Sequence, residues 1–355
     1  MDFIAEYGLF LAKTITLALA VLFVVLLIVS MAARNRGNAR DKGSLQVLNL
    51  NDALDDMRDE LRHEVLDPEL VKAEDKAEKK REKAERKARG KTPAPEAERK
   101  RVYVLDFDGD THASQVEELR HSITAVLGFA RPGVDEVLLR LESPGGMVHA
   151  YGLAASQLTR LRKHDIRLTV CVDKVAASGG YMMACIADKL LAAPFAYIGS
   201  IGVLVQLPNV HRLLKEHKVD FEMITAGEYK RTLNNFGENT DKDRAKVQEE
   251  VDEMHDLFKS FIHEYRPSLN VAHVATGEVW TGTQALPRGL IDGIDTSDEW
   301  LLAESNDADL YAVSWEHKRK ISDRLSELFE GALSKGLQRS LDRLLHRADK
   351  EKFYS

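Results

Sequence analysis

One serine stands among small residues in the stretch KVAASGGYMMAC, residues 174–185. Ser178 precedes two glycines and a helix-like apolar run, so we expect its hydroxyl to be exposed where a helix begins. The backbone N–H of Gly179 would then point into the adjacent space. A hydroxyl beside a free N–H suits acyl transfer, because the N–H can bind the oxyanion that forms. A small residue that only allows close helix packing is the alternative interpretation.

A glycine pair in the stretch ESPGGMV, residues 142–148, offers further backbone N–H groups. Glycine lets the backbone approach a bound peptide without an intervening side chain. Either Gly145 or Gly146 could therefore supply a second oxyanion donor, and the sequence leaves open which of them does. An ordinary turn and a phosphate-binding loop are the alternatives. The presence of the Ser178 motif in the same chain favours the catalytic interpretation.

A serine hydroxyl needs a base before it can act as a nucleophile. Among the twelve histidines, His149 lies nearest to the glycine turn, but no His/Asp pair stands out. Lys230, in FEMITAGEYKRT, is the second candidate: we predict a strand at 221–224 and a glycine turn that projects the lysine into the same cleft. A lysine acts as a base only when burial or a neighbouring cation, such as Arg231, lowers its pKa from about 10.4. A plain surface lysine is the alternative.

The elements that must position these residues begin at residue 101. Hydrophobic patterning predicts alternating strands and helices. The strands are expected at 101–107, 134–143 and 166–173, and the helices at 112–130, at 147–164 and from Ser178 onward. Such alternation is typical of an α/β fold with repeated β-α-β units and a parallel sheet, in which ligands bind beyond the carboxyl ends of the strands. Both glycine motifs fall at those ends.

The amino terminus predicts a membrane anchor. Residues 14–33 carry no charge over about the length that a helix needs to cross a bilayer. A cleaved secretory signal is the alternative, although the apolar run exceeds the usual 7 to 15 residues. Only Lys13 precedes this span, whereas four basic residues follow it: Arg34, Arg36, Arg40 and Lys42. The positive-inside rule therefore predicts that the rest of the chain lies in the cytoplasm.

Charged and amphipathic segments flank the α/β region. Residues 71–100 are nearly all Lys, Arg, Glu and Ala, which favours a solvated helical spacer over a surface for acidic partners or lipid head groups. Past residue 300, leucines recur at three- and four-residue spacing, typical of an amphipathic helix or helix pair. Core or subunit packing, or a membrane-surface role, would bury that apolar face.

Composition narrows the remaining classes. The net charge of -7 over 355 residues, without a basic patch, gives no argument for nucleic-acid binding. Cys171 and Cys185 lack metal-type spacing and are expected to be buried free thiols. We therefore expect neither a metal nor a cofactor.

Five motifs, taken together, resemble the signal peptide peptidase A family of membrane serine peptidases over residues 101–300. They are ESPGG (142–146), VAASGGYMMA (175–184), AYIGSIGV (196–203), GEYKRT (227–232) and GEVWTGTQALPRGLIDGI (277–294). The resemblance implies a ClpP/crotonase-like fold, a Ser/Lys dyad and a homo-oligomer that encloses it. It also implies a bacterial inner-membrane location. Family analogy favours the periplasmic side, in conflict with the positive charges after the span.

Residue roles follow from the same resemblance. Ser178 matches the nucleophile and Lys230 the general base, while Ser200 matches a hydroxyl that hydrogen-bonds and positions the lysine amine. Gly179 and the turn of Gly145 and Gly146 match the oxyanion-hole segments. No histidine stands in AYIGSIGVLVQ, where ClpP-type relatives carry one, which supports a lysine mechanism.

The sequence thus predicts four regions. They are an anchor at 1–33, a charged and largely helical spacer at 34–100, a peptidase domain at 101–300 and an amphipathic helical extension at 301–355. The expected function is membrane-anchored serine endopeptidase, acting on hydrophobic or unfolded peptides or signal-peptide remnants. A catalytically silent membrane scaffold or chaperone-like binding protein on the same fold is the alternative. Acyl-CoA chemistry is a third reading, but no motif suggests adenine or pantetheine recognition.

Overall fold

The structure is a computed structural model that describes residues 43–72 and 99–317, with isolated positions at 13, 16, 76, 80, 83 and 84. It separates into two units, Met1–Ser44 with Glu316–Ser355, and Leu45–Trp315, and the described elements belong chiefly to the second. The predicted span at 14–33, much of the predicted spacer and the leucine-rich part of the C-terminal extension lie outside the described residues. None of the helices that the structure describes is long and apolar enough to cross a bilayer.

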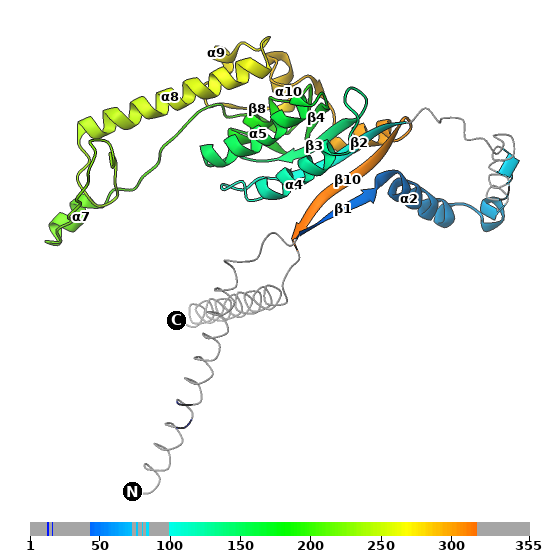
Figure 1. The fold of residues 1–355 in the computed structure, drawn as a ribbon, viewed down its shortest axis with the longest axis horizontal. Helices are drawn as coiled ribbons and strands as arrows, with labels where there is room; N and C mark the ends of the chain where they lie inside the picture. The colour runs from blue at the N-terminus through cyan, green and yellow to red at the C-terminus, as the bar shows by residue number, and fades with distance from the viewer. Residues whose placement is uncertain are drawn as a thin grey trace, which may run out of the picture. The chain divides into compact units, whose positions relative to one another are not determined.

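The main sheet is parallel, as predicted for the α/β fold class. Among the described residues it has seven strands in the order β1-β10-β2-β3-β4-β6-β9, and every pair from β10 to β9 runs parallel. The strands are β1 (Gly43–Asn49), β2 (Lys100–Asp108), β3 (Glu136–Glu142), β4 (Arg167–Val172), β6 (Lys189–Ala192), β9 (Gly293–Ile294) and β10 (Ala308–His317). The β-α-β alternation from residue 101 is thereby confirmed (Figure 1).

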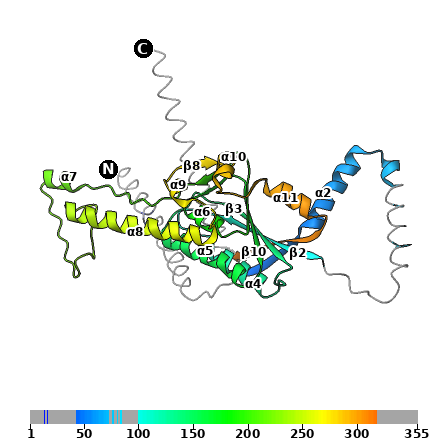
Figure 2. The same cartoon turned by 90° about the horizontal axis from the view of Figure 1, so that it is seen from above.

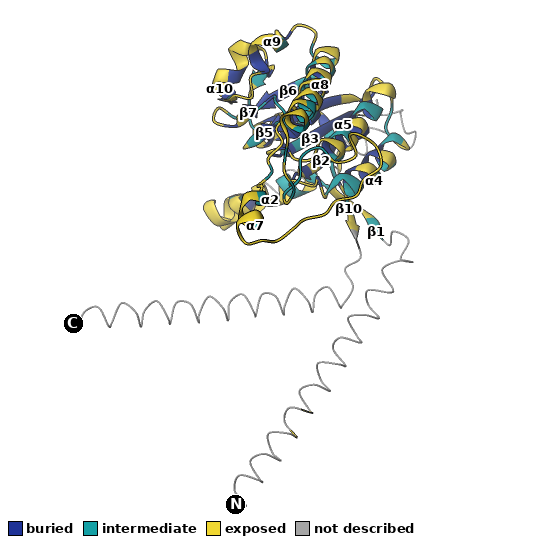
Figure 3. Ribbon diagram, turned by 90° about the vertical axis from the view of Figure 1, so that its left-hand side faces the viewer, coloured by how far each residue is buried: buried dark blue, intermediate teal, exposed yellow. Residues whose placement is uncertain are grey.

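Two apolar layers cover this sheet. Helices α4 (Val116–Leu127) and α5 (Val148–Lys163) pack on one face, and α11 (Ser297–Glu304) packs on the other. Successive residues of β2 alternate between them: Tyr103 and Leu105 belong to the first layer, whereas Val102 and Val104 lie in the second with Trp300. Because side chains alternate across a strand, burial of both faces requires an apolar run. Figure 3 shows the strands as the buried centre of the domain.

Two strands occupy regions that the sequence assigned differently. β1 lies in the region predicted as helical spacer and β10 in the region predicted as helical extension, so both of those predictions are wrong at these residues. β10, ADLYAVSWEH, carries the aromatic and β-branched residues that suit a pleated surface. It pairs with β2, placing Leu310 beside Val102. Helix α2 (Leu50–Val65) has no buried residue and lies within the region predicted as a charged, largely helical spacer.

A smaller sheet carries the glycine and serine motifs. It consists of β5 (Val175–Ala177), β7 (Tyr197–Gly199) and β8 (Val279–Thr281), with β5 and β7 parallel and β7 and β8 antiparallel. Helix α6 (Gly179–Ala184) follows β5 directly. The short elements α9 (Val271–Val274), α10 (Gly282–Ala285) and η2 (Leu286–Arg288) complete this side of the domain.

An extended segment leaves the domain after β7 and returns through a long helix. We call residues 203–240 the arm; it contains α7 (His211–Glu216) and leads into α8 (Asp241–Tyr265). Figures 1 and 2 both place α7 at the end of α8 that is remote from the sheets. The strand predicted at 221–224 is wrong, because these residues are irregular and Ile224 is 97% exposed. An apolar run forms a strand only where a partner edge is available.

Candidate active site

Ser178 occupies a sharp turn between β5 and α6. Its backbone has φ 52° and ψ −118°, a conformation that non-glycine residues rarely adopt. The Ser178 N–H donates to the carbonyl of Gly199 at 2.8 Å, which holds the turn against β7. The residue is half-buried. A strained strand-to-helix turn that lifts a serine hydroxyl to the surface is the arrangement of a nucleophile elbow.

Gly179 is required by the close packing behind the serine. A Cβ at this position would lie 2.8 Å from Cδ1 of Tyr151, whose ring fills the space beneath α6. Because Gly179 is the first residue of α6, its N–H has no acceptor within the helix. Within the described residues, this N–H directly follows the serine and has no hydrogen-bond acceptor.

The glycine turn after β3 lies directly against Ser178. Gly145 has φ +88°, and a Cβ there would come within 2.7 Å of both Ser178 Cβ and Gly179 N. The N–H of Gly145 already donates to Ser143 Oγ at 3.1 Å. Gly146 is exposed, and in the described part of the chain its N–H has no hydrogen-bond acceptor. Gly146 is thus the turn glycine whose N–H is free to bind a ligand.

Ser200 directly follows the neighbouring strand β7, beside Ser178. β5 and β7 run parallel with Ala177 opposite Gly199, so the residues that follow each strand are neighbours. Ser200 also has a positive φ, of 52°, and its N–H donates to the carbonyl of Glu278 at 2.7 Å. The structure therefore brings together both serines and all three predicted glycines.

Lys230 lies on the exposed arm. Its neighbours hold this part of the arm to the amino end of α8: Glu228 pairs with Lys242 at 2.6 Å, and the Tyr229 ring lies 5.4 Å from the ammonium of Lys246. α8 contacts α6 and enters the core only further on, at Phe258.

Twelve residues of helix separate Lys246 from Phe258, which corresponds to about 18 Å. The single chain thus carries Lys230 away from Ser178, contrary to the predicted projection from a strand end into the same cleft.

The histidine alternative receives no geometric support. His149 lies in the first turn of α5 with its side chain exposed. In the parts of the chain that the structure describes, no hydrogen bond joins a histidine to Ser178. The two cysteines are free and buried, as predicted, and burial raises the pKa of each thiol to about 12.

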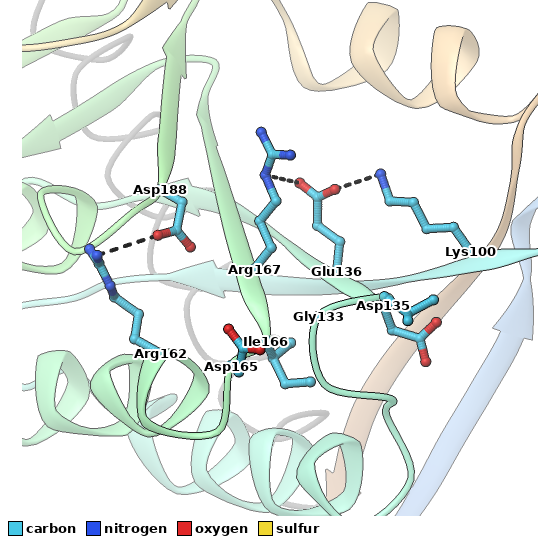
Figure 4. Close-up of a pocket in the computed structure, with 10 residues that line it drawn as sticks. Lys100, Gly133, Asp135, Glu136, Arg162, Asp165, Ile166, Arg167 and Asp188 are labelled. Atoms are coloured by element: carbon cyan, nitrogen blue, oxygen red, sulfur yellow. Dashed lines mark ion pairs between the residues drawn. The ribbon is translucent and has the colours of Figure 1, made fainter.

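A cavity of about 530 Å³ lies at the amino ends of the inner strands of the main sheet. Figure 4 shows its charged lining, in which Glu136 lies between Lys100 and Arg167. The Glu136 carboxylate is 2.6 Å from the Lys100 amine and 3.8 Å from the Arg167 guanidinium. These residues begin β2, β3 and β4, whereas ligands of parallel sheets bind beyond the carboxyl ends. We interpret this cavity as a structural ion-pair cluster rather than the active site.

Sequence reasoning missed three residues behind the site: Asp110, Ser143 and Tyr151. Ser143 and Tyr151 are completely buried, and their hydroxyl oxygens are 2.6 Å apart. Ser143 directly precedes the Pro-Gly-Gly turn, and a polar residue at the end of an apolar strand was the available signal. Tyr151 resembles any aromatic residue on the apolar side of a helix, so only the fold shows its role.

Comparison with known proteins agrees with this geometry. Residues 2–158 match the description "Peptidase family S49 N-terminal" and residues 160–310 match "Peptidase family S49". A "Probable protease SohB" of Haemophilus influenzae is 48% identical over 325 residues, covering 90% of this chain and 91% of that protein. A protein of the same name from Buchnera aphidicola subsp. Schlechtendalia chinensis is 46% identical over 312 residues, covering 85% of this chain and 100% of the relative.

Both family descriptions name a peptidase, and together they span nearly all of the described domain. The predicted resemblance is thereby confirmed. Because these family models match residues 2–158 and 160–310, and the SohB relatives align over most of their own length, this chain belongs to peptidase family S49.

Proposed function

We propose that the chain is a membrane-anchored serine endopeptidase in which Ser178 forms an acyl-enzyme and Lys230 is the general base. One observation carries the proposal: Ser178 stands on a strained turn, directly against the glycine turn and next to the Gly179 N–H, which has no acceptor among the residues that the structure describes. Backbone donors held rigidly where an oxyanion develops are a major source of catalytic power in acyl transfer.

The proposed reaction has two steps. Ser178 Oγ attacks the peptide carbonyl while neutral Lys230 Nζ accepts its proton, and the N–H groups of Gly179 and Gly146 bind the oxyanion. The tetrahedral intermediate then expels the amine, which takes the proton from the lysine. In the second step Lys230 Nζ takes a proton from water, which attacks the acyl group. The lysine then returns the proton to Ser178 Oγ as the acyl–serine bond breaks. Ser200, beside Ser178, is placed to hold the lysine amine without the opposing charge of a carboxylate.

Because Lys230 of the same chain is carried away from Ser178, we assign the base to Lys230 on the arm of a second copy. The arm exposes a set of large apolar side chains, which a soluble monomer rarely displays together. They are Leu213 (54%), Val219 (51%), Phe221 (44%), Met223 (44%), Ile224 (97%) and Phe236 (50%). A homo-oligomer would bury this surface and bring each lysine to the serine of its neighbour.

Hydrophobic or unfolded peptides are the proposed substrates. Met147 follows the glycine turn and is 40% exposed, while Leu204 and Val205 follow Ser200 and are 79% and 59% exposed. Apolar side chains of a peptide would find matching contacts there. The proposed anchor at 14–33 would hold the enzyme at a bacterial inner membrane. A reporter fused after Ser355 decides between the cytoplasmic side, favoured by the charges after the span, and the periplasmic side, favoured by the family.

Active-site labelling tests the nucleophile and the base. Purified wild type, Ser178→Ala and Lys230→Ala would be treated with a fluorophosphonate and analysed by intact mass. We expect one adduct on the wild type, none on Ser178→Ala and much slower labelling of Lys230→Ala. A folded, assembled wild type that takes no adduct would contradict the proposal and favour the silent scaffold or chaperone-like protein.

Mixing the two inactive variants tests the assignment of Lys230 to a second copy. Ser178→Ala still carries the lysine and Lys230→Ala still carries the serine, so mixed oligomers should regain peptide cleavage. The double variant, mixed with either single variant under the same conditions, is the control and should restore none. Full co-assembly without recovered activity would show that each chain supplies its own lysine.

A further inference from the structure

A chain of hydrogen bonds runs through the buried space behind the glycine turn. Gly145 N–H lies 3.1 Å from Ser143 Oγ, which lies 2.6 Å from the Tyr151 hydroxyl oxygen. The Tyr151 hydroxyl in turn donates to the backbone carbonyl of Asp110 at 2.8 Å. Ser143 and Tyr151 are both fully buried, so water does not compete for these bonds.

The two ends determine the direction of every bond in this chain. A carbonyl only accepts, so the single Tyr151 proton goes to Asp110. The Ser143 proton must then go to the Tyr151 oxygen, which leaves the Ser143 lone pairs to accept from Gly145. Only one arrangement of protons satisfies the two hydroxyls, the Asp110 carbonyl and the Gly145 N–H. In this arrangement the Gly145 N–H is bound to Ser143 and is not available to a ligand.

We propose that this chain of hydrogen bonds positions the oxyanion hole. Tyr151 and Ser143 act by orienting the Gly146 N–H toward the reacting carbonyl. Holding Gly145 N–H inward fixes the peptide plane before Gly145. The next peptide plane, which carries the Gly146 N–H, then has its orientation set by the positive φ of Gly145. The inference rests on the proposed function, since an oxyanion hole matters only if Ser178 reacts.

The loop that begins at Asp110, where the hydrogen-bond chain ends, is itself held in place. The Asp110 carboxylate accepts from the N–H groups of His112 and Ser114, at 3.0 and 2.9 Å, and from the Ser114 hydroxyl at 2.7 Å. The neighbouring Thr111 carbonyl accepts from Met147 N–H at 2.9 Å. The loop therefore holds the glycine turn on both sides, through Tyr151 before Gly146 and through Thr111 after it.

Tyr151 also connects the two halves of the oxyanion hole. Its ring packs beneath Gly179, while its hydroxyl supports the turn that carries Gly146. Burial raises the pKa of the Tyr151 hydroxyl above its ordinary value, so the proton that the chain needs stays bound at neutral pH. One side chain thus sets the spacing of both N–H donors.

Three variants of the full-length protein test the proposal: Tyr151→Phe, Ser143→Ala and the double variant. Tyr151→Phe keeps the ring beneath Gly179 and removes only the hydroxyl. We expect kcat for peptide cleavage to fall about tenfold in Tyr151→Phe and up to about a hundredfold in Ser143→Ala, with KM unchanged, because small misplacements of a catalytic group cost this much. Because the bonds act in series, the double variant should be no slower than Ser143→Ala.

Tyr181→Phe is the matched control. The Tyr181 hydroxyl is equally buried and donates to the carbonyl of Leu290 at 2.9 Å, so its removal also costs one hydroxyl–carbonyl bond. It has no bond to the glycine turn. Tyr151→Phe also removes the bond from the Ser143 hydroxyl, so we expect Tyr181→Phe to lower the melting temperature by less than Tyr151→Phe, while its kcat stays within about twofold, a ratio that corresponds to ~0.4 kcal/mol.

The outcomes separate this inference from the proposed function. Equal kcat in Tyr151→Phe and Tyr181→Phe, or additive losses in the double variant, would overturn it even if the wild type is an active peptidase. If the wild type neither cleaves nor takes a fluorophosphonate, the catalytic proposal fails. Hydrogen exchange over residues 143–147 still tests the chain: faster exchange in Tyr151→Phe than in Tyr181→Phe supports the hydrogen bonds, and equal exchange contradicts them.

Discussion

The two halves of the proposed dyad lie in contrasting surroundings. The turn of Ser178 is bounded by buried residues, and its backbone is held by β7 and by the packing of Tyr151 beneath α6. Lys230 stands on the exposed arm, whose neighbouring contacts are a surface ion pair and a cation–π contact with α8. Exposed pairs of this kind contribute little to stability because solvent screens them. Contacts within one chain therefore hold the proposed nucleophile in place, whereas we propose that the base is supplied by a second copy.

Replacing Lys230 should separate activity from stability most clearly. Lys230→Ala removes the proposed base, and we expect a loss of about 10⁴-fold in kcat/KM, comparable to the loss of the base-orienting residue in a serine protease triad. The melting temperature should stay unchanged because the side chain is exposed. Peptide cleavage and thermal unfolding of the same preparation measure both. Retained activity would remove Lys230 from the mechanism.

Gly179→Ala should damage activity and stability together. The added methyl group would meet the Tyr151 ring and shift the first N–H of α6. We expect a loss of about 10² to 10³-fold in kcat, similar to removal of one oxyanion donor, and a lower midpoint in urea. Gly152→Ala, within α5 at a site where a Cβ meets nothing within 4 Å, is the control. Its activity should be unchanged, and its urea midpoint should rise rather than fall, because alanine favours a helix interior over glycine.

Ile224→Asp tests whether the arm is an interface. This side chain is 97% exposed in the single chain, so the free energy of monomer unfolding should not change. In an oligomer the carboxylate would be buried without a partner, and we expect activity to fall at least about tenfold, which corresponds to ~1.4 kcal/mol. Native mass spectrometry would show the loss of assembly. An unaltered oligomer would place the interface elsewhere.

Asp135→Asn should alter stability and leave the reaction rate unchanged. Although burial raises the pKa of Asp135, hydrogen bonds from Arg131 and Arg101 outweigh it and hold this pKa below its usual range. A lowered folded-state pKa adds stability that is present above the unfolded value and lost as pH falls through the folded value.

Acid unfolding measures this contribution. The free-energy difference between wild type and Asp135→Asn should shrink toward zero below about pH 3.8, which is near the ordinary carboxyl pKa. At neutral pH we expect the variant to be less stable by about 3 kcal/mol, as for other broken buried pairs. A difference that is constant with pH would contradict the role of the charge.

Local sequence patterns were sufficient to predict the parallel sheet and the serine and glycine residues of the site. Ser178, Gly179 and the glycine pair adjoin strands whose apolar runs mark them clearly, and parallel strands bring their carboxyl ends together. The strand at 221–224 could not be judged in the same way. Its apolar residues match a strand pattern, but among the described residues no strand pairs with them. A short stretch of sequence cannot show whether such a partner strand exists.

What the sequence determined by itself was the chemistry of the parts: a serine before two glycines, a second glycine turn, and membership of a peptidase family. Only the tertiary structure decided which N–H of the turn is free, because that depends on Ser143 and Tyr151, which pack from β3 and α5. It also decided that Lys230 lies on the exposed arm, where the neighbouring residues Glu228 and Tyr229 contact the amino end of α8. Both outcomes arise from contacts between distant residues, whereas sequence patterns report only neighbours along the chain.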